Sequence, residues 1–174
     1  MLILALSFLI VLLDQLTKHL VRQQLALGED VAVVSGLFSI RYVQNTGAAW
    51  GIFSGLSHWL VLLSVVILVL LLVFRRHFMS DTAVHRVATG LMIAGIVGNL
   101  VDRVRLGYVV DFLHFHWGGK SFPTFNVADS AICIGVGLYL VSQWWGSERG
   151  TRQDRDSVAV EEAHPQPGER GGVG

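Results

Sequence analysis

The stretch that decides the fold is SHWLVLLSVVILVLLLVF, which occupies residues 57–74 and carries no charged side chain. A helix that crosses a membrane needs about 20 mostly apolar residues, with about 17 as a lower limit. This stretch meets the requirement over its whole length. We therefore predict a membrane-spanning helix here.

Three further apolar stretches extend this prediction to a four-helix membrane protein. They occupy residues 1–21, 87–101 and 127–145. The first and last are long enough only if Asp14 and Asp129 lie near the membrane boundary, and the third must extend toward its N-terminus. The first stretch lacks a basic leader and a small-x-small cleavage site, so we expect a retained helix rather than a signal peptide.

The composition agrees with a membrane protein. The chain has 174 residues, of which 52% are hydrophobic and only 15% are charged, and its mean hydropathy is +0.55. Its 13 basic and 13 acidic residues cancel, which leaves no electrostatic case for a nucleic-acid partner. The single cysteine, Cys133, excludes an internal disulfide and a cysteine-based metal site.

The connections divide the chain into a membrane domain and a tail. Residues 22–56 and 103–126 form long connections, and the first contains two short strand-like segments, 31–34 and 38–43. We expect one domain over residues 1–146. The polar, glycine-rich segment 147–174 is expected to be a disordered tail.

Four aspartates are predicted to converge on one side of the membrane. When the four crossings are followed in order, Asp14, Asp102 and Asp129 end at the same face, and Asp111 lies in a long connection on that face. Carboxylates near the membrane are costly and tend to be functional. For any one of them alone, an interfacial residue or a helix cap is the better explanation, but four on one face favour a functional site.

Two of these aspartates follow an asparagine at a spacing of three. The pairs are Asn99 with Asp102 and Asn126 with Asp129, and this spacing places an amide and a carboxylate on one helix face. The second pair also matches a helix-capping arrangement. Asp102 precedes Arg103, so we expect a structural ion pair between them.

Asp111 lies among Val109, Val110, Phe112 and Leu113. Such a setting should raise the pKa of its carboxyl group by desolvation, and a nearby ionised Asp129 should raise it further. Two carboxyl groups that share one proton can activate water and protonate a peptide carbonyl, as in aspartic proteases. The alternative is a strand with one polar face.

Other kinds of site have weaker support. His114 and His116 alternate beside Asp111, which permits a metal site but more often marks an interfacial strand. Gly90, Gly95 and Gly98 form a small-residue face that predicts close helix packing. A proton-coupled carrier and a structural membrane subunit remain alternatives to an enzyme. The carrier predicts acidic residues at several depths rather than at one end.

At these residues the chain resembles the bacterial lipoprotein signal peptidase (signal peptidase II) family. The resemblance extends from Met1 to about Trp145 and rests on five segments that occur in the family's order. They are Asp14-Gln15-Leu16-Thr17-Lys18, Asn45-Thr46-Gly47-Ala48-Ala49, Gly98-Asn99-Leu100-Val101-Asp102-Arg103, Gly107-Tyr108-Val109-Val110-Asp111-Phe112 and Phe125-Asn126-Val127-Ala128-Asp129-Ser130.

This resemblance implies an all-α polytopic membrane protein with four transmembrane helices and a small β-rich extracytoplasmic cradle. It implies an aspartyl endopeptidase of the bacterial cytoplasmic (inner) membrane, with both termini in the cytoplasm. The implied substrates are diacylglyceryl-modified prolipoproteins, cleaved before the lipidated cysteine, and the other partners are membrane lipids. We expect a monomer without metal or other cofactor. Basic residues are about equally frequent on the two sides of the membrane, so the positive-inside rule alone does not decide the orientation. Arg75 and Arg76, in the shortest loop, favour the cytoplasm for the side that carries the C-terminal tail.

The resemblance also implies roles for individual residues. Asp111 and Asp129 match the catalytic pair of the family. Substrate binding or support of the site is implied for Asp14, Lys18, Asn45, Gly47, Ala48, Asn99, Asp102, Arg103 and Asn126.

Overall fold

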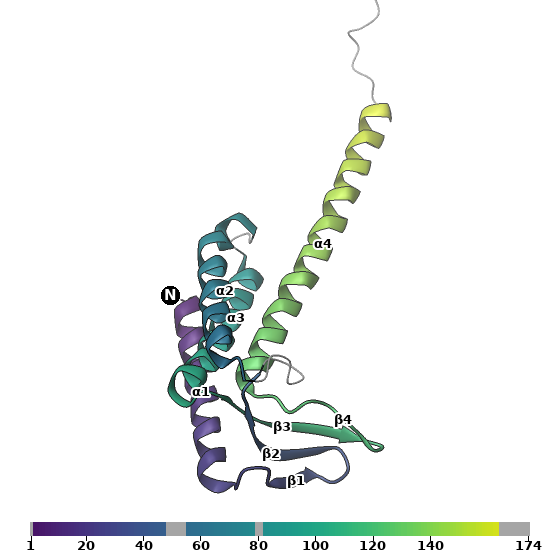
Figure 1. The fold of residues 1–174 in the computed structure, drawn as a ribbon. Coiled ribbons are helices and arrows are strands. Elements are labelled where there is room, and N and C mark those ends of the chain that lie inside the picture. Colours follow the sequence, from purple (N-terminus) through teal and green to yellow (C-terminus); the bar gives the residue numbers. More distant parts are fainter. Residues whose placement is uncertain (1, 48–54, 79–81, 164–174) are drawn as a thin grey trace, which may run out of the picture. The chain divides into compact units, whose positions relative to one another are not determined.

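The fold combines long apolar helices with a small antiparallel sheet (Figure 1). The computed structural model describes residues 2–47, 55–78 and 82–163. Within them lie four helices that are long and apolar enough to cross a membrane. These are α1 (Leu2–Gln24), α2 (Ser57–Phe78), α3 (Ala83–Leu106) and α4 (Val127–Ala163). The predicted four helices are therefore confirmed.

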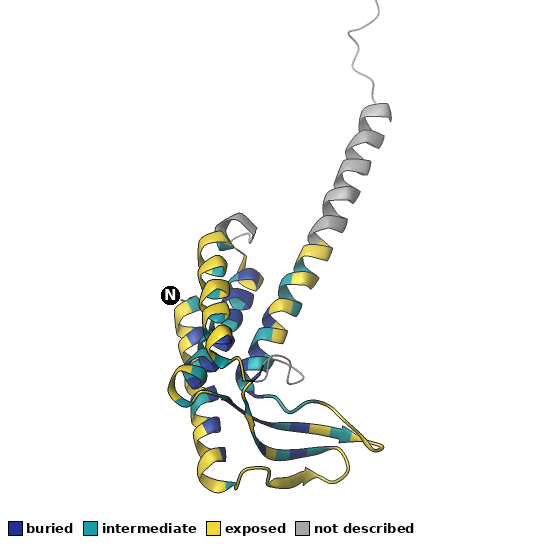
Figure 2. Ribbon diagram, viewed as in Figure 1, coloured by how far each residue is buried: buried dark blue, intermediate teal, exposed yellow. Residues whose placement is uncertain are grey.

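The helix α3 is the central element of the membrane part. Half of its apolar span is buried, against 6% for α2, and Figure 2 shows the contrast between the two. The helix begins after Thr82, whose side chain accepts a hydrogen bond from the backbone N–H of His85. It ends at Gly107, whose φ of 81° lies in the left-handed region that glycine adopts without strain. The short third apolar stretch thus becomes a full span by starting at Ala83.

Small residues allow α3 to approach its neighbours closely. A Cβ added at Gly98 would lie 2.7 Å from Asp14 Oδ2 on α1 and 3.1 Å from the side chain of Ala128 on α4. One added at Gly95 would meet the backbone oxygen of Ala128 and lie 2.5 Å from Ile132 Cγ1. The predicted small-residue packing face is confirmed.

The sheet has the order β1-β2-β3-β4, and all its strand pairs are antiparallel. Its strands are β1 (Asp30–Val34), β2 (Phe38–Asn45), β3 (Val109–Trp117) and β4 (Lys120–Ser121). The two strands expected in the first long connection are confirmed, and β3 shows that Asp111 lies in a strand. A buried cluster of Val21, Tyr42, Val110 and Phe112 joins the sheet to the last turns of α1.

The chain divides into two compact units, Met1–Tyr139 and Leu140–Gly174. In the second unit the described residues are helical, because α4 continues to Ala163. Residues 147–163 are therefore helical where we expected a disordered tail. This segment contains no proline, and nine of its 17 residues are Glu, Arg, Gln or Ala, which favour helix. Residues 164–174 lie outside the described part of the chain.

The close packing of α3 predicts that Gly95→Ala destabilises the protein. The added methyl group has to displace both the backbone of α4 at Ala128 and the side chain of Ile132, and such overpacking costs about 1–3 kcal/mol. Gly137→Ala is the matched control, because nothing lies within 4 Å of its added Cβ. Thermal unfolding in detergent should show a lower Tm for the first variant only. An unchanged Tm for Gly95→Ala would contradict the packing.

Candidate active site

The ammonium group of Lys18 joins two helices at the base of the site. Lys18 is only 2% exposed on α1. Its Nζ lies 2.8 Å from Asp14 Oδ2 and 3.0 Å from Asp102 Oδ2, and it donates a hydrogen bond of 3.0 Å to Asn99 Oδ1. The cation therefore compensates two buried carboxylates, which would otherwise be costly next to the membrane.

Asp14 connects this group of charges to α4. Its carboxylate is fully buried, and its Oδ1 accepts a hydrogen bond of 2.9 Å from the backbone N–H of Ala128 in the first turn of α4. Because the first N–H groups of a helix have no partner within the helix, a carboxylate there both satisfies a donor and complements the helix dipole. This contact fixes the start of α4 against α1 and α3.

The partner of Asp102 differs from the one expected. Asp102 pairs with Lys18, and its carboxylate accepts hydrogen bonds from Gln15 Nε2 at 2.9 Å and from the backbone N–H of Val110 at 3.1 Å. Arg103 instead donates from Nη2 to the backbone oxygen of Gly47 at 3.0 Å. The expected ion pair between Asp102 and Arg103 is wrong, because consecutive residues of a helix do not face each other.

Asn126 contacts both candidate catalytic aspartates. Its side chain is fully buried, and its Nδ2 donates to Asp111 Oδ1 at 2.7 Å and to Asn99 Oδ1 at 3.2 Å. Its Oδ1 accepts from the backbone N–H of Asp129 at 2.9 Å, and its own N–H donates to Asp129 Oδ2 at 3.2 Å. The predicted capping arrangement is therefore present, and the same residue also reaches Asp111.

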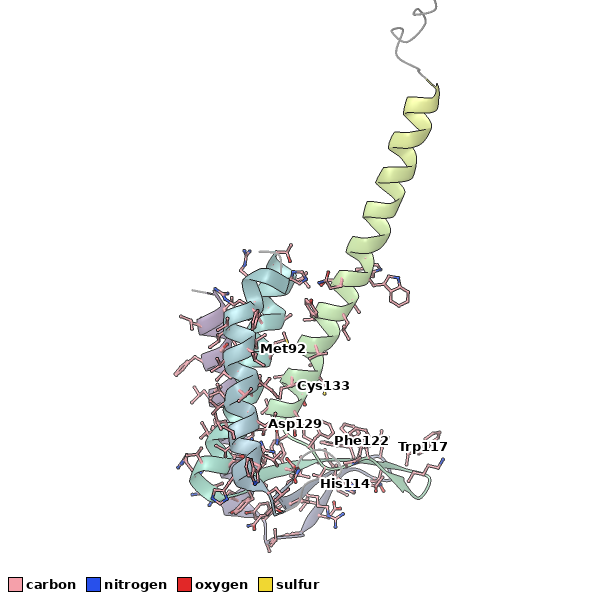
Figure 3. All side chains as sticks on the ribbon, turned by 45° about the horizontal axis from the view of Figure 1, so that its top comes forward. Met92, His114, Trp117, Phe122, Asp129 and Cys133 are labelled. Carbon is pink, nitrogen blue, oxygen red and sulfur yellow. The ribbon has the colours of Figure 1, made fainter. Side chains whose placement is uncertain are left out.

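All four carboxylate oxygens of Asp111 and Asp129 accept hydrogen bonds from N–H groups. Besides the two bonds from Asn126, Asp129 Oδ1 accepts from Asn99 Nδ2 at 2.7 Å, and Asp111 Oδ2 accepts from Asn45 Nδ2 at 2.9 Å. Figure 3 shows Asp129 at the end of α4 that lies next to the sheet. Both carboxyl groups are thus held in fixed orientations by three asparagines.

The environment of Asp111 raises its pKa to about 7, chiefly because the group is buried and secondly because Asp129 is close. The hydrogen bonds from Asn45 and Asn126 act in the opposite direction. Every residue of β3 from Val109 to Phe112 is buried, so both faces of the strand are covered here. The alternative of a strand with one polar face does not describe this segment.

The remaining predicted residue with a described position is Gly47. Its backbone oxygen binds Arg103, and its N–H donates to Asn45 Oδ1 at 2.9 Å, so the end of β2 is tied to α3. Ala48 lies outside the described residues. The structure therefore brings together every predicted site residue that it describes.

Sequence reasoning missed Gln15 as a member of the site. Its Nε2 donates to Asp102 Oδ1 at 2.9 Å and to the backbone oxygen of Gly98 at 3.2 Å. The available signal was its position three residues before Lys18, which places both on one face of α1.

The two histidines of β3 do not join the aspartates. His114 Nδ1 lies 3.2 Å from Ser39 Oγ on the neighbouring strand β2 and 3.4 Å from Asp30 Oδ2 on β1. The ring of His116 lies 5.3 Å from that of His114. In the part of the chain that the structure describes, no three His, Cys, Asp or Glu side chains form a group that could hold a metal ion.

Comparison with known proteins assigns this arrangement to a family. Residues 6–145 match the family model described as Signal peptidase (SPase) II. A lipoprotein signal peptidase of Syntrophotalea carbinolica is 44% identical over 145 residues, which cover 82% of this chain and 90% of that protein. One of Symbiobacterium thermophilum is 39% identical and covers 87% of this chain and 99% of its own length.

Solved structures give the same result. A bacterial membrane enzyme solved by the in meso method at 2.3 Å resolution is similar with a TM-score of 0.77 and 33% sequence identity. The similarity covers 84% of this chain and 90% of that one. The chain therefore belongs to the signal peptidase II family of bacterial membrane aspartic peptidases, which remove signal peptides from prolipoproteins.

Proposed function

We propose that Asp111 and Asp129 are the catalytic pair of this peptidase, and that it cleaves diacylglyceryl-modified prolipoproteins immediately before the lipidated cysteine. The observation that carries the proposal is the buried side chain of Asn126, which contacts both aspartates. A carrier would need acidic residues at several depths, whereas the aspartates of the candidate spans all belong to this one network.

The surroundings of the two carboxyl groups suggest different roles. Asp111, whose pKa is raised to about 7, is suited to carry the proton. Asp129 lies in the first turn of α4 and accepts hydrogen bonds from a backbone N–H and an amide, which favour a carboxylate. Asp129 therefore takes a proton from water while the water oxygen attacks the scissile carbonyl carbon. Asp111 donates its proton to the carbonyl oxygen.

Collapse of the resulting tetrahedral intermediate completes the reaction. The bond between carbon and nitrogen breaks, Asp129 returns its proton to the leaving nitrogen, and Asp111 recovers a proton from the intermediate's hydroxyl group. The positive charge of Arg103 acts on both aspartates and is placed to favour the negative charge that develops between them. No step needs a metal ion, since the carboxylate oxygens are oriented by N–H donors.

The other site residues hold these groups in place. Asn45, Asn99 and Asn126 orient the carboxyl groups directly. Lys18, together with Asp14 and Asp102, fixes the helices that carry them. Gly47 and Ala48 are proposed to line the path of the substrate peptide.

The position of the site relative to the spans supports a lipid-anchored substrate. Asp102 lies near the C-terminal end of the span of α3, and Asp129 lies near the N-terminal end of the span of α4, so consecutive crossings bring both to one side of the membrane. The sheet begins after the C-terminal end of α1, which lies on the same side. Arg75 and Arg76 lie at the other end of α2, where the positive-inside rule favours the cytoplasm. We therefore place the site and the sheet at the extracytoplasmic face of the cytoplasmic membrane.

The catalytic assignment predicts that Asp111→Asn and Asp129→Asn each lower the cleavage rate by at least about a hundredfold, because an amide can neither donate nor accept the required proton. Asp30→Asn is the matched control, since Asp30 lies on β1 beside His114. Purified variants should be assayed on one prolipoprotein with the amount of folded protein verified. Activity within a few fold of wild type in either site variant would refute the pair.

The proposed substrate class predicts that the diacylglyceryl group is required. Each methylene buried in the membrane contributes about 0.8 kcal/mol, so the acyl chains hold the peptide at the depth of the aspartates. The measurement is a paired detergent assay with one signal-peptide substrate, modified and unmodified. Equal cleavage rates would point to a more general membrane protease.

The raised pKa of Asp111 predicts a pH-dependent contribution to stability. Because the folded-state pKa of about 7 exceeds the ordinary aspartate pKa of 3.8 expected in the unfolded chain, the folded protein binds this proton more tightly than the unfolded one. The contribution is complete below pH 3.8 and is lost as the pH rises through 7. Between pH 5 and pH 8, Tm should therefore fall more for wild type than for Asp111→Asn. Parallel pH profiles of Tm would contradict the raised pKa.

A further inference from the structure

We propose that a basic pocket between α1 and α3 binds the phosphate group of an anionic phospholipid. The pocket has a volume of about 50 Å³, well above the roughly 10–15 Å³ that one water molecule needs. Its polar lining consists of Gln15, Lys18, His19, Arg22, Asp102 and Arg105. We call it the α1–α3 pocket.

The lining residues form one stripe on each helix. Residues 15, 18, 19 and 22 recur at intervals of three and four along α1, and Asp102 and Arg105 are three apart on α3. Residues at these spacings share a helix face. The pocket is thus built by the facing sides of two packed helices rather than by a mobile loop.

The charge of the pocket is positive. Lys18 and Asp102 neutralise each other in its floor at 3.0 Å. Arg22 and Arg105 are exposed, and the ion pairs found among the described residues involve neither of them. Lys18, Arg22 and Arg105 carry three positive charges, and Asp14 and Asp102 carry two negative charges, so a net charge of one positive unit remains. Arginine matches the geometry of a phosphate group particularly well, because its guanidinium presents two parallel N–H donors.

The depth of the pocket suits a lipid headgroup. We take the membrane boundary near Asp102, close to the end of the apolar span of α3. At 1.5 Å per residue, Arg105 lies about 4.5 Å beyond Asp102, and Lys18 lies about 6 Å beyond Asp14. The headgroup layer extends about 5–7 Å beyond the hydrocarbon core on each side. Arg22 lies further out and reaches back with its long side chain.

The surfaces next to the pocket suit the acyl chains of the same lipid. Leu16 and Leu20 on α1 are 51% and 42% exposed, and Val104 on α3 is 68% exposed. These apolar side chains are adjacent in sequence to the residues that line the pocket. A phospholipid whose phosphate contacts the arginines would therefore place its chains along exposed apolar helix surface. This favours a lipid over a free anion.

The test compares lipid binding by two double variants of the full chain. Native mass spectrometry in detergent measures the Kd for phosphatidylglycerol and for phosphatidylcholine with the same acyl chains. Arg22→Gln/Arg105→Gln should weaken phosphatidylglycerol binding about thirtyfold, since each arginine contributes about fivefold near an anionic lipid. Arg41→Gln/Lys120→Gln removes the same charge from exposed positions of the sheet and should leave the Kd unchanged.

Other outcomes would overturn the proposal. Equal weakening by both double variants, or equal affinity for the two lipids, would indicate unspecific attraction. Stabilisation of Tm by inorganic phosphate at the concentration effective for the lipid would indicate a free-anion site. If the double variant fails to fold, each single variant should show about fivefold weaker binding, and an unchanged Kd in both would refute the site. Asp111→Asn/Asp129→Asn should bind lipid as wild type does, which separates this result from the proposed catalysis.

Discussion

The buried ammonium group of Lys18 is the interaction on which the rest of the structure depends. It contacts carboxylates from α1 and α3 and an amide oxygen from α3. Each carboxylate then binds a backbone N–H elsewhere, Asp14 at the start of α4 and Asp102 at β3. Removal of one partner from such a buried group leaves an uncompensated charge, which costs about 3–5 kcal/mol. The cation thereby fixes the elements that carry both catalytic candidates, α4 and β3.

The sequence predicted the helices and the convergence of the aspartates, because both depend on the lengths and the order of the apolar stretches. Apolar length indicates the spans, and the number of crossings decides at which face each aspartate ends. It did not predict the partner of Asp102. That choice depends on how α1 and α3 face each other, which brings Lys18 to Asp102, whereas the neighbour Arg103 points toward the end of β2. Proximity in sequence was a poor guide to proximity in space.

The helical segment after residue 146 has a different explanation. Its polar composition suggested a disordered tail, but polarity does not exclude helix, since Glu, Arg, Gln and Ala all have high helix propensity. The first proline after the fourth apolar stretch is Pro165, so nothing in the sequence forces α4 to end earlier. Helix propensity, rather than hydropathy, was the informative property here.

Asn126 explains why the two carboxyl groups can differ although they are close. Its backbone N–H and its side-chain oxygen are both used by Asp129, in an arrangement that also starts α4. Its side-chain nitrogen is left for Asp111, which lies on a strand covered on both sides. Asp129 therefore gains a backbone donor that Asp111 lacks, and Asp111 is held chiefly by amide side chains and burial. This difference supports the proposed roles, in which Asp111 carries the proton and Asp129 is the base, because only the helix terminus supplies a fixed dipole.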